Sequence, residues 1–238
     1  MNDLLVFIPA WNEDQSLPAV LDDLAAELPE ADVVVIDDGS GDATADVARR
    51  GGAEVIRFPE NRGLPAAIAA GYSHAHSHGY AVCGRLDADG QHPAAELRRL
   101  VAEVRTGRCD VAVGSRYLTG EEHEPHRYRI KGPRRLGTAV VRRAMGVLLR
   151  RPFHDPMSGM WAVAGNATEL LARPYKSTAP EVEALMRVGE AGLRLEELPV
   201  HMRQREHGES KLQGRKAVGV VLTVAGTLIV GWRLLRRR

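Results

Sequence analysis

The sequence predicts an α/β protein with a mostly parallel, doubly wound sheet and helices on both of its faces. In the first half of the chain, short apolar runs alternate with stretches whose apolar residues recur at helical spacing. The runs at residues 33–36, 54–58 and 80–86 are largely apolar without clean alternation, which is typical of strands covered on both faces. Polar side chains follow the predicted strands, where ligands collect in such sheets. Right-handed crossovers then give the doubly wound arrangement.

Local features support each expected helix of the first half. Ser16 can cap a helix that carries leucines at helical spacing up to Leu28. Ser40 or Asp42 can cap a second helix that runs through residue 48. A turn at residues 61–63 precedes a third helix at 66–75, and a proline opens a fourth at 93–105. The expected strands are residues 4–8, 33–36, 54–58, 80–86 and 110–113.

The second half of the chain is less regular. Residues 119–135 are polar and basic, and we interpret them as a mobile loop. An amphipathic helix is expected at 136–149, a helix at 180–189 and a strand at 195–202. With no long linker and no internal repeat, the pattern indicates one α/β domain at 1–212, followed by a C-terminal segment at 213–238.

Composition excludes some classes of function. Across 238 residues, 32 Lys and Arg balance 31 Asp and Glu, for a net charge of +1. A general nucleic-acid binder needs a strong excess of basic residues, so we expect no nucleic-acid partner. The two cysteines, Cys83 and Cys109, lie in or beside apolar runs and are interpreted as buried thiols. The N-terminus lacks the features of a signal peptide, so the bulk of the chain is expected in the cytoplasm.

Polar side chains follow four of the predicted strands, at the point where each strand ends. Because the carboxyl ends of parallel strands meet at one edge of a sheet, these segments are expected to converge there. Three of the four segments are acidic, a clustering that packing of a core does not require. The segments are Pro9-Ala10-Trp11-Asn12-Glu13, Asp37-Asp38-Gly39-Ser40, Asp87-Ala88-Asp89-Gly90-Gln91 and Gly114-Ser115-Arg116.

The third of these segments suits a divalent metal ion. Asp87 and Asp89, separated by one residue, can both reach a hard cation such as Mg²⁺ or Mn²⁺, and Gln91 offers another oxygen. Such a cation would neutralise a diphosphate leaving group. The carboxylates after the second strand suit the hydrogen-bond donors of a base or ribose, and Trp11 can stack on a flat ring. Ordinary turns, helix caps and a core tryptophan are the alternatives.

Basic residues near the end of the predicted domain suit a phosphate-rich ligand. Arg205 and Lys211 lie in a segment that also contains Gly208, so it could close over a diphosphate. A solvated surface loop is the alternative.

In order along the chain, these motifs resemble those of the family 2 glycosyltransferases of GT-A fold. The later segments 155–160 and 205–211 are similar to the branch that transfers sugars to dolichyl phosphate or polyprenyl phosphate. The resemblance covers residues 3–212. The motifs are 9–13, 37–44, 61–63, 87–92, 114–117, 155–160 and 205–211.

The resemblance implies a set of site residues and a pair of substrates. The donor would be a nucleotide-diphospho-sugar linked to GDP or UDP, and the sugar would be mannose or glucose. Its site would consist of Pro9, Trp11, Glu13, Ile36, Asp38, Asp87, Ala88, Asp89, Gln91, Arg205 and Lys211. Asp87, Asp89 and Gln91 would hold Mg²⁺ or Mn²⁺. Arg116, Arg134 and Thr138 would bind the phosphate of the lipid acceptor. The chain departs from the family at Trp11, where tyrosine is commoner, and at Leu64-Pro65.

The nature of the acceptor decides the mechanism. The oxygen of a polyprenyl phosphate is already anionic and can attack the anomeric carbon with inversion, so that positioning and charge neutralisation by Asp89 and Arg205 carry catalysis. A hydroxyl acceptor needs a carboxylate base, for which Asp155, Glu181 and Glu183 are candidates.

The C-terminal segment suits a membrane surface. Residues 217–232 carry no charge and are bracketed by basic residues, but a membrane-spanning helix needs about 20 apolar residues. We therefore expect a helix in the cytoplasmic surface of the membrane, with the basic residues on anionic lipid. The alternative is a helix packed against the sheet or against the partner in a homo-oligomer.

Two other enzyme classes share parts of the pattern. A haloacid-dehalogenase-type phosphatase would place its Asp-x-Asp after the first strand, whereas here the pair at 37–38 precedes Asp87. A sugar nucleotidyltransferase would need a Gly-rich basic loop after the first strand, and Trp11-Asn12-Glu13 is not such a loop.

Overall fold

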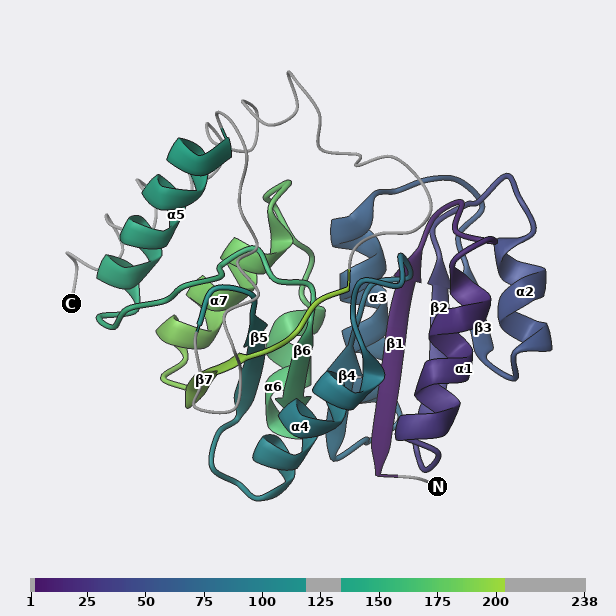
Figure 1. Ribbon diagram of the computed structural model, residues 1–238, viewed down its shortest axis with the longest axis horizontal. Helices are drawn as coiled ribbons and strands as arrows, with labels where there is room; N and C mark the ends of the chain where they lie inside the picture. The colour runs from purple at the N-terminus through teal and green to yellow at the C-terminus, as the bar shows by residue number, and fades with distance from the viewer. Residues whose placement is uncertain (1–2, 119–133, 204–238) are drawn as a thin grey trace.

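The computed structural model describes residues 3–118 and 134–203, without the side chains of 134–138 and 140. In this part of the chain, one sheet has the strand order β3-β2-β1-β4-β6-β5-β7, with helices on both faces (Figure 1). The strands are β1 (Leu4–Ala10), β2 (Asp32–Asp37), β3 (Glu54–Arg57), β4 (Val82–Arg85), β5 (Val111–Ser115), β6 (Trp161–Ala164) and β7 (Leu195–Pro199). The helices are α1 (Leu17–Glu27), α2 (Thr44–Arg50), α3 (Leu64–Ser77), α4 (Ala94–Arg105), α5 (Arg134–Leu148), α6 (Gly165–Ala172) and α7 (Pro180–Glu190).

The sheet is mostly parallel, as predicted. β1 pairs in parallel with β2 and β4, β2 with β3, and β5 with β7. The exception is β6, which runs antiparallel between β4 and β5. The prediction lacked β6 and the helix α6 that follows it. Four residues of strand carry too little periodicity to separate a strand from a loop.

Alternation along the strands divides the apolar side chains between two cores. Leu5 and Phe7 of β1 face a core formed with α3, α6 and α7, which Val141 and Met145 of α5 also join. Leu4 and Val6 face the second core, which includes side chains of α1, α2 and α4. Both faces of β1 are therefore buried, which explains why its sequence is apolar at every position.

The predicted caps were wrong in detail. Ser16 occupies the N-cap position of α1 with helical backbone angles, and its hydroxyl donates to Glu13 Oε2 at 2.9 Å instead of capping the helix. The N-cap of α2 is Ala43. The two predicted caps lie just before it, where Ser40 Oγ accepts the Asn12 N–H and Asp42 Oδ1 accepts the Thr44 N–H. These side chains bind neighbouring loops together and so shape the edge of the sheet. Both cysteines are buried thiols, as expected.

Candidate active site

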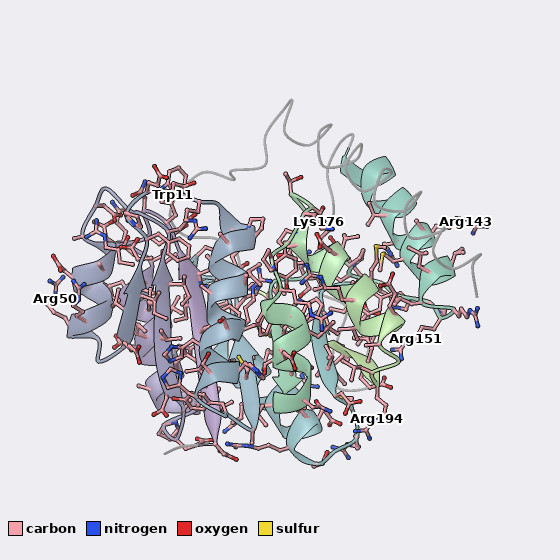
Figure 2. All side chains as sticks on the ribbon, turned by 180° about the vertical axis from the view of Figure 1, so that it is seen from behind. Trp11, Arg50, Arg143, Arg151, Lys176 and Arg194 are labelled. Atoms are coloured by element: carbon pink, nitrogen blue, oxygen red, sulfur yellow. The ribbon has the colours of Figure 1, made fainter. Side chains whose placement is uncertain are left out.

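The carboxyl ends of β1, β2, β4 and β5 lie at the same edge of the sheet. β1 is parallel to β2 and β4, and β4 and β5 are both antiparallel to β6, so all four strands point the same way. Figure 2 shows Trp11 at this carboxyl edge and Arg194 at the opposite one. The predicted convergence of the four polar segments is confirmed for their backbone.

Hydrogen bonds join the loops that follow β1 and β2. The Asn12 N–H donates to Ser40 Oγ at 3.0 Å, and the Gly41 N–H donates back to Asn12 Oδ1 at 2.9 Å. The Glu13 N–H donates to Thr44 Oγ1 at 2.9 Å. Asn12 adopts a left-handed conformation, with φ of 54°. These bonds hold the loop in which the Trp11 side chain is 39% exposed at the carboxyl edge, rather than buried in the core.

The two carboxylates after β2 anchor different neighbours. Asp38 Oδ1 accepts the Arg62 N–H at 2.7 Å, and its Oδ2 accepts the Gly63 N–H at 2.8 Å. Asp37 Oδ1 accepts the Ser40 N–H, and its Oδ2 lies 3.2 Å from Arg57 Nε. A carboxylate has about four lone-pair positions, so Asp38 can accept further bonds from a ligand.

Tight packing of backbone holds Asp38 against the turn before α3. Gly39, with φ of 70°, lies so close to that turn that a Cβ would stand 2.4 Å from the carbonyl carbon of Glu60. Pro9 and Ile36 pair in register on β1 and β2 and are buried. The assignment of these residues to a nucleotide site stays a prediction.

Asp87 and Asp89 follow β4 on a short loop. The Asp87 backbone N–H donates to His92 Nδ1 at 2.9 Å, and Asp89 Oδ1 accepts the Gln91 N–H at 3.1 Å. Ala88, between them, is buried in the core. The Asp87 side chain remains 35% exposed, and its Oδ1 lies 3.4 Å from Arg85 Nη2. The loop therefore presents a carboxylate at the edge of the sheet while its apolar residue fastens it to the core.

Neighbouring charges keep Asp87 ionised. Burial opposes ionisation, but the permanent charges of Arg85 and, more weakly, Arg116 outweigh it and hold the pKa of Asp87 below its ordinary value. For His92 burial dominates and lowers its pKa, although Asp87 and Asp89 act in the opposite direction. The imidazole is therefore neutral at pH 7, which suits the acceptance of the Asp87 N–H at Nδ1.

These residues fit a hard divalent cation that also binds phosphate. Among the described residues there is no cluster of three or more His, Cys, Asp or Glu side chains able to enclose a metal ion. Mg²⁺ and Mn²⁺ do not need such a cage, because Mg²⁺ is usually held by one or two carboxylates while substrate phosphates and water complete its shell. The ionised Asp87, with Asp89 and the amide of Gln91 on the same loop, matches that set of donors.

Beside the Asp87 loop, Arg116 and Asp155 form a bidentate ion pair. Arg116 Nε and Nη2 each lie 2.7 Å from an Asp155 oxygen, and the Arg116 N–H also donates to Oδ2 at 3.1 Å. Asp155 is 1% exposed. Glu197 of β7 accepts the Asp155 N–H at 2.6 Å and the His154 N–H. The carboxylate that was predicted as a base is therefore committed to holding Arg116.

The other two candidate bases are also engaged. Glu181 Oε1 lies 2.8 Å from Arg85 Nη2. Glu183 accepts the N–H groups of Lys176 and Ser177 and pairs with Arg187 at 2.7 Å. None of the three described candidates offers an uncommitted carboxylate to a hydroxyl group.

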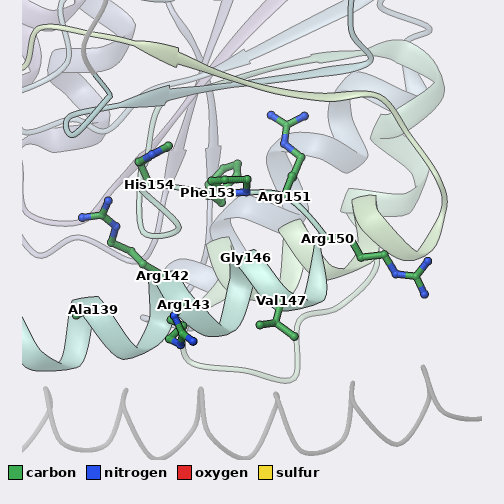
Figure 3. Close-up of a pocket in the computed structure, with 10 residues that line it drawn as sticks. Ala139, Arg142, Arg143, Gly146, Val147, Arg150, Arg151, Phe153 and His154 are labelled. Carbon is green, nitrogen blue, oxygen red and sulfur yellow. The ribbon is translucent and has the colours of Figure 1, made fainter.

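Further arginines lie next to Arg116. The guanidinium groups of Arg116 and of Arg142 on α5 lie 5.4 and 5.5 Å from the centre of the Tyr117 ring. Arg142 also lines an open hollow of about 630 Å³ between α5 and the segment that follows it (Figure 3). Arg143, Arg150 and Arg151 line the same hollow, and Val147 on α5 is 67% exposed. This side of the molecule suits an anionic ligand or surface.

Several predicted residues lie outside the described part of the chain. They are Arg205, Lys211, residues 119–133 of the loop predicted at 119–135 and the apolar run at 217–232. The last two residues of that predicted loop are not loop, because α5 begins at Arg134. The backbone of Arg134 and Thr138 belongs to the first turns of α5, but their side chains are not described. No described helix is long and apolar enough to cross a membrane.

Sequence reasoning gave no role to four residues around the site, Arg85, His92, Arg142 and Gly159, although His92 and Gly159 lie within the motifs at 87–92 and 155–160. A Cβ on Gly159 would stand 2.3 Å from Asp87 Oδ2, so its backbone forms a wall against that carboxylate. Arg85 could have been found from the sequence, because it ends an apolar strand and an arginine is almost never fully buried unless an acidic partner pairs with it.

Comparison with known proteins identifies the family. The model of glycosyl transferase family 2 matches residues 5–162. The chain belongs to this family. An undecaprenyl-phosphate mannosyltransferase of Micrococcus luteus is 33% identical over 99% of this chain and 98% of its own length. A polyprenol monophosphomannose synthase of Mycolicibacterium smegmatis is 31% identical over 98% of this chain and 89% of its own length.

The fold is shared with solved glycosyltransferases. The crystal structure of glucosyl-3-phosphoglycerate synthase from Mycobacterium tuberculosis, with Mn²⁺, UDP-glucose and phosphoglyceric acid, matches with a TM-score of 0.69. The match covers 95% of this chain and 80% of the synthase at 19% identity. The GT-A fold that the motifs predicted is therefore confirmed, and this family 2 member is a glycosyltransferase.

Proposed function

We propose that this glycosyltransferase moves a hexose from a nucleotide-diphospho-sugar to a polyprenyl phosphate, with inversion at the anomeric carbon. The observation that carries the proposal is the state of the three carboxylates that the sequence offers as bases. Asp155 and Glu181 are locked in buried ion pairs, and Glu183 binds backbone and Arg187. A hydroxyl acceptor needs a base, whereas an anionic phosphate oxygen attacks without one.

The names of the relatives support the same acceptor class. The relatives from Micrococcus luteus and Mycolicibacterium smegmatis match nearly the whole of this chain, and both are named for a mannose and a polyprenyl lipid. Mannose is therefore the first sugar to test, with glucose as the second. The nucleotide to test first is GDP, followed by UDP.

On the donor side, Asp87, Asp89 and Gln91 would hold Mg²⁺ or Mn²⁺. A bound cation supplies neutralisation of the charge that grows on the diphosphate as the sugar leaves. The exposed Trp11 ring and Asp38 would orient the nucleoside at the ends of β1 and β2. Glu13, Pro9, Ile36 and Ala88 would complete the donor pocket, and Arg205 and Lys211 would hold the diphosphate.

On the acceptor side, Arg116 would bind the lipid phosphate with Arg134 and Thr138. Asp155 fixes the guanidinium plane of Arg116 through two hydrogen bonds of 2.7 Å, so in this proposal it is a positioning residue rather than a base. The arginines of the hollow beside α5 would face anionic headgroups at the membrane surface (Figure 3). Residues 213–238 would strengthen that attachment on the cytoplasmic face.

The proposal is tested by transfer of radiolabelled sugar to lipid. Purified protein is incubated with polyprenyl phosphate in detergent, Mn²⁺, and GDP-mannose or UDP-glucose, and the organic extract is counted. We expect radiolabelled sugar in the lipid extract, and we expect mild acid to release that sugar from the lipid. We expect no labelled lipid with Asp89→Ala or in the presence of a chelator. Label in the extract that survives chelation, or equal activity of Asp89→Ala, would contradict the metal assignment. Absence of lipid product with every nucleotide-sugar would contradict the acceptor.

A further inference from the structure

Arg85 is a buried charge at the centre of the sheet. It is the last residue of β4, pairs in register with Phe7 of β1 and Trp161 of β6, and its side chain is 3% exposed. Cys83, two residues earlier on the same face of the strand, belongs to the core formed with α3, α6 and α7. Taking an arginine out of water is costly unless hydrogen bonds and an opposite charge compensate.

A single nitrogen of Arg85 bridges two carboxylates. Nη2 lies 2.8 Å from Glu181 Oε1 in the first turn of α7, and 3.4 Å from Asp87 Oδ1. Glu181 is itself buried, and the N-terminus of α7 favours its negative charge. Glu181 is therefore the closer of the two carboxylates to the arginine. Arg85 Nε has no hydrogen-bond partner among the described residues, so the ion pair does not satisfy every donor of the guanidinium group.

Stability alone does not account for this ion pair. Apolar residues of similar volume often replace a buried ion pair without loss of stability, so such a pair is weak evidence of a stabilising role. What distinguishes this pair is its third partner. Asp87 carries the partly exposed carboxylate of the Asp87–Asp89 loop, and a Cβ on Gly159 would stand 2.3 Å from its Oδ2 and 2.9 Å from its Oδ1.

We infer that Arg85 and Glu181 form a positioning pair that orients Asp87 toward the divalent cation of the donor site. This inference rests on the proposed function. Arg85 lies 3.4 Å from Oδ1, and the backbone of Gly159 restricts rotation of the carboxylate, most closely at Oδ2. Glu181 neutralises the positive charge of Arg85, so the negative charge of Asp87 remains available to bind the cation. Groups that orient a metal ligand in this way commonly contribute 10- to 100-fold to metal affinity.

The test compares metal-dependent binding in matched variants. Arg85→Met/Glu181→Met removes both charges and retains the volume, and Glu181→Gln leaves Arg85 to pair with Asp87 alone. Arg187→Met is the control, because Arg187 pairs with Glu183 in the same helix at 2.7 Å, outside the proposed donor site. Calorimetry measures binding of GDP and of UDP with Mn²⁺ and with chelator, and circular dichroism measures the melting temperature.

We expect both Arg85–Glu181 variants to bind the Mn²⁺–nucleoside diphosphate at least about tenfold more weakly than the parent. Their binding of the nucleotide with chelator should be unchanged, and Arg85→Lys should recover part of the loss. Arg187→Met should melt at a lower temperature with unchanged Mn²⁺-dependent affinity. If the double variant does not fold, Glu181→Gln alone decides.

Two results would overturn the inference in distinguishable ways. If the Arg85–Glu181 variants keep the parent's Mn²⁺-dependent affinity while Asp87→Asn loses it, the pair does not position Asp87 and the metal site stands. If Asp87→Asn and Asp89→Asn both keep that affinity, the metal assignment fails, and with it the inference.

Discussion

Replacing Asp155 by Asn separates a positioning role from that of a base. In the parent, Arg116 donates to both oxygens of Asp155 at 2.7 Å, and the carboxylate is 1% exposed. The amide keeps one acceptor oxygen but turns an NH₂ group toward the guanidinium. Loss of one charge-assisted bond and of the buried charge balance costs about 2–4 kcal/mol. For a chain of this size, that lowers the melting temperature by roughly 5–15 °C.

The kinetic consequence follows from which group touches the acceptor. On the proposal that Arg116 binds the acceptor phosphate, loosening it weakens that contact, so the KM for polyprenyl phosphate should rise by about tenfold, corresponding to roughly 1.4 kcal/mol. The kcat should fall less, and the pH profile should keep its shape. The assay is steady-state transfer at saturating donor over pH 6–9. A fall in kcat of about 100-fold or more with an unchanged acceptor KM would instead identify Asp155 as a general base and refute the reasoning.

Three further predictions concern other parts of the molecule. Gly159→Ala places a Cβ 2.3 Å from Asp87 Oδ2 and so must displace that carboxylate. A displacement of about 1 Å can lower turnover on the order of 100-fold, which is measured as kcat at saturating Mn²⁺. Turnover equal to that of the parent would show that the close contact at Gly159 does not position Asp87. Asp42→Asn tests pH-dependent stability: burial raises the pKa of Asp42, but hydrogen bonds from Thr44 and Asp14 outweigh it and lower that pKa. Its stabilisation is therefore present above the unfolded pKa of about 3.9 and is lost as pH falls through the lower folded pKa, so the melting temperatures of parent and variant should differ at pH 7 and draw together only in that acidic range. A constant difference at all pH values would count against this. Deletion of 213–238 should reduce sedimentation with anionic vesicles, and unchanged sedimentation would remove the C-terminal segment from the account.

The pattern of apolar runs was sufficient to predict most of the sheet. β1 is apolar throughout and β2 is apolar from Val33 to Ile36 because these residues pack into the cores on both faces of the sheet, and this property is visible without any knowledge of their partners. β6 was missed because its position between β4 and β5 depends on pairings with strands more than 45 residues away. Short strands of this kind are specified by tertiary packing, which local propensity does not report.

The candidate site was predictable where function depends on strand ends. Asp87 and Asp89 follow an apolar strand, and their location at the carboxyl edge follows from the topology alone. The pairing of Asp155 with Arg116, and of Glu181 with Arg85, was not predictable. The first pair joins residues 39 positions apart and the second joins residues 96 positions apart. From the sequence alone, the same two acidic residues are equally good candidates for a general base.

The identity of the nucleophile is the central claim, and one pair of substrates tests it most directly. A polyprenyl phosphate and the polyprenol of the same chain length differ only in the phosphate. Given each in turn with the nucleotide-sugar that the protein accepts and with Mn²⁺, we predict that mass spectrometry detects a hexosyl-phosphoryl lipid from the first and no glycosylated polyprenol from the second. Glycosylation of the polyprenol at a comparable rate would show that the enzyme activates a hydroxyl, and would contradict the account.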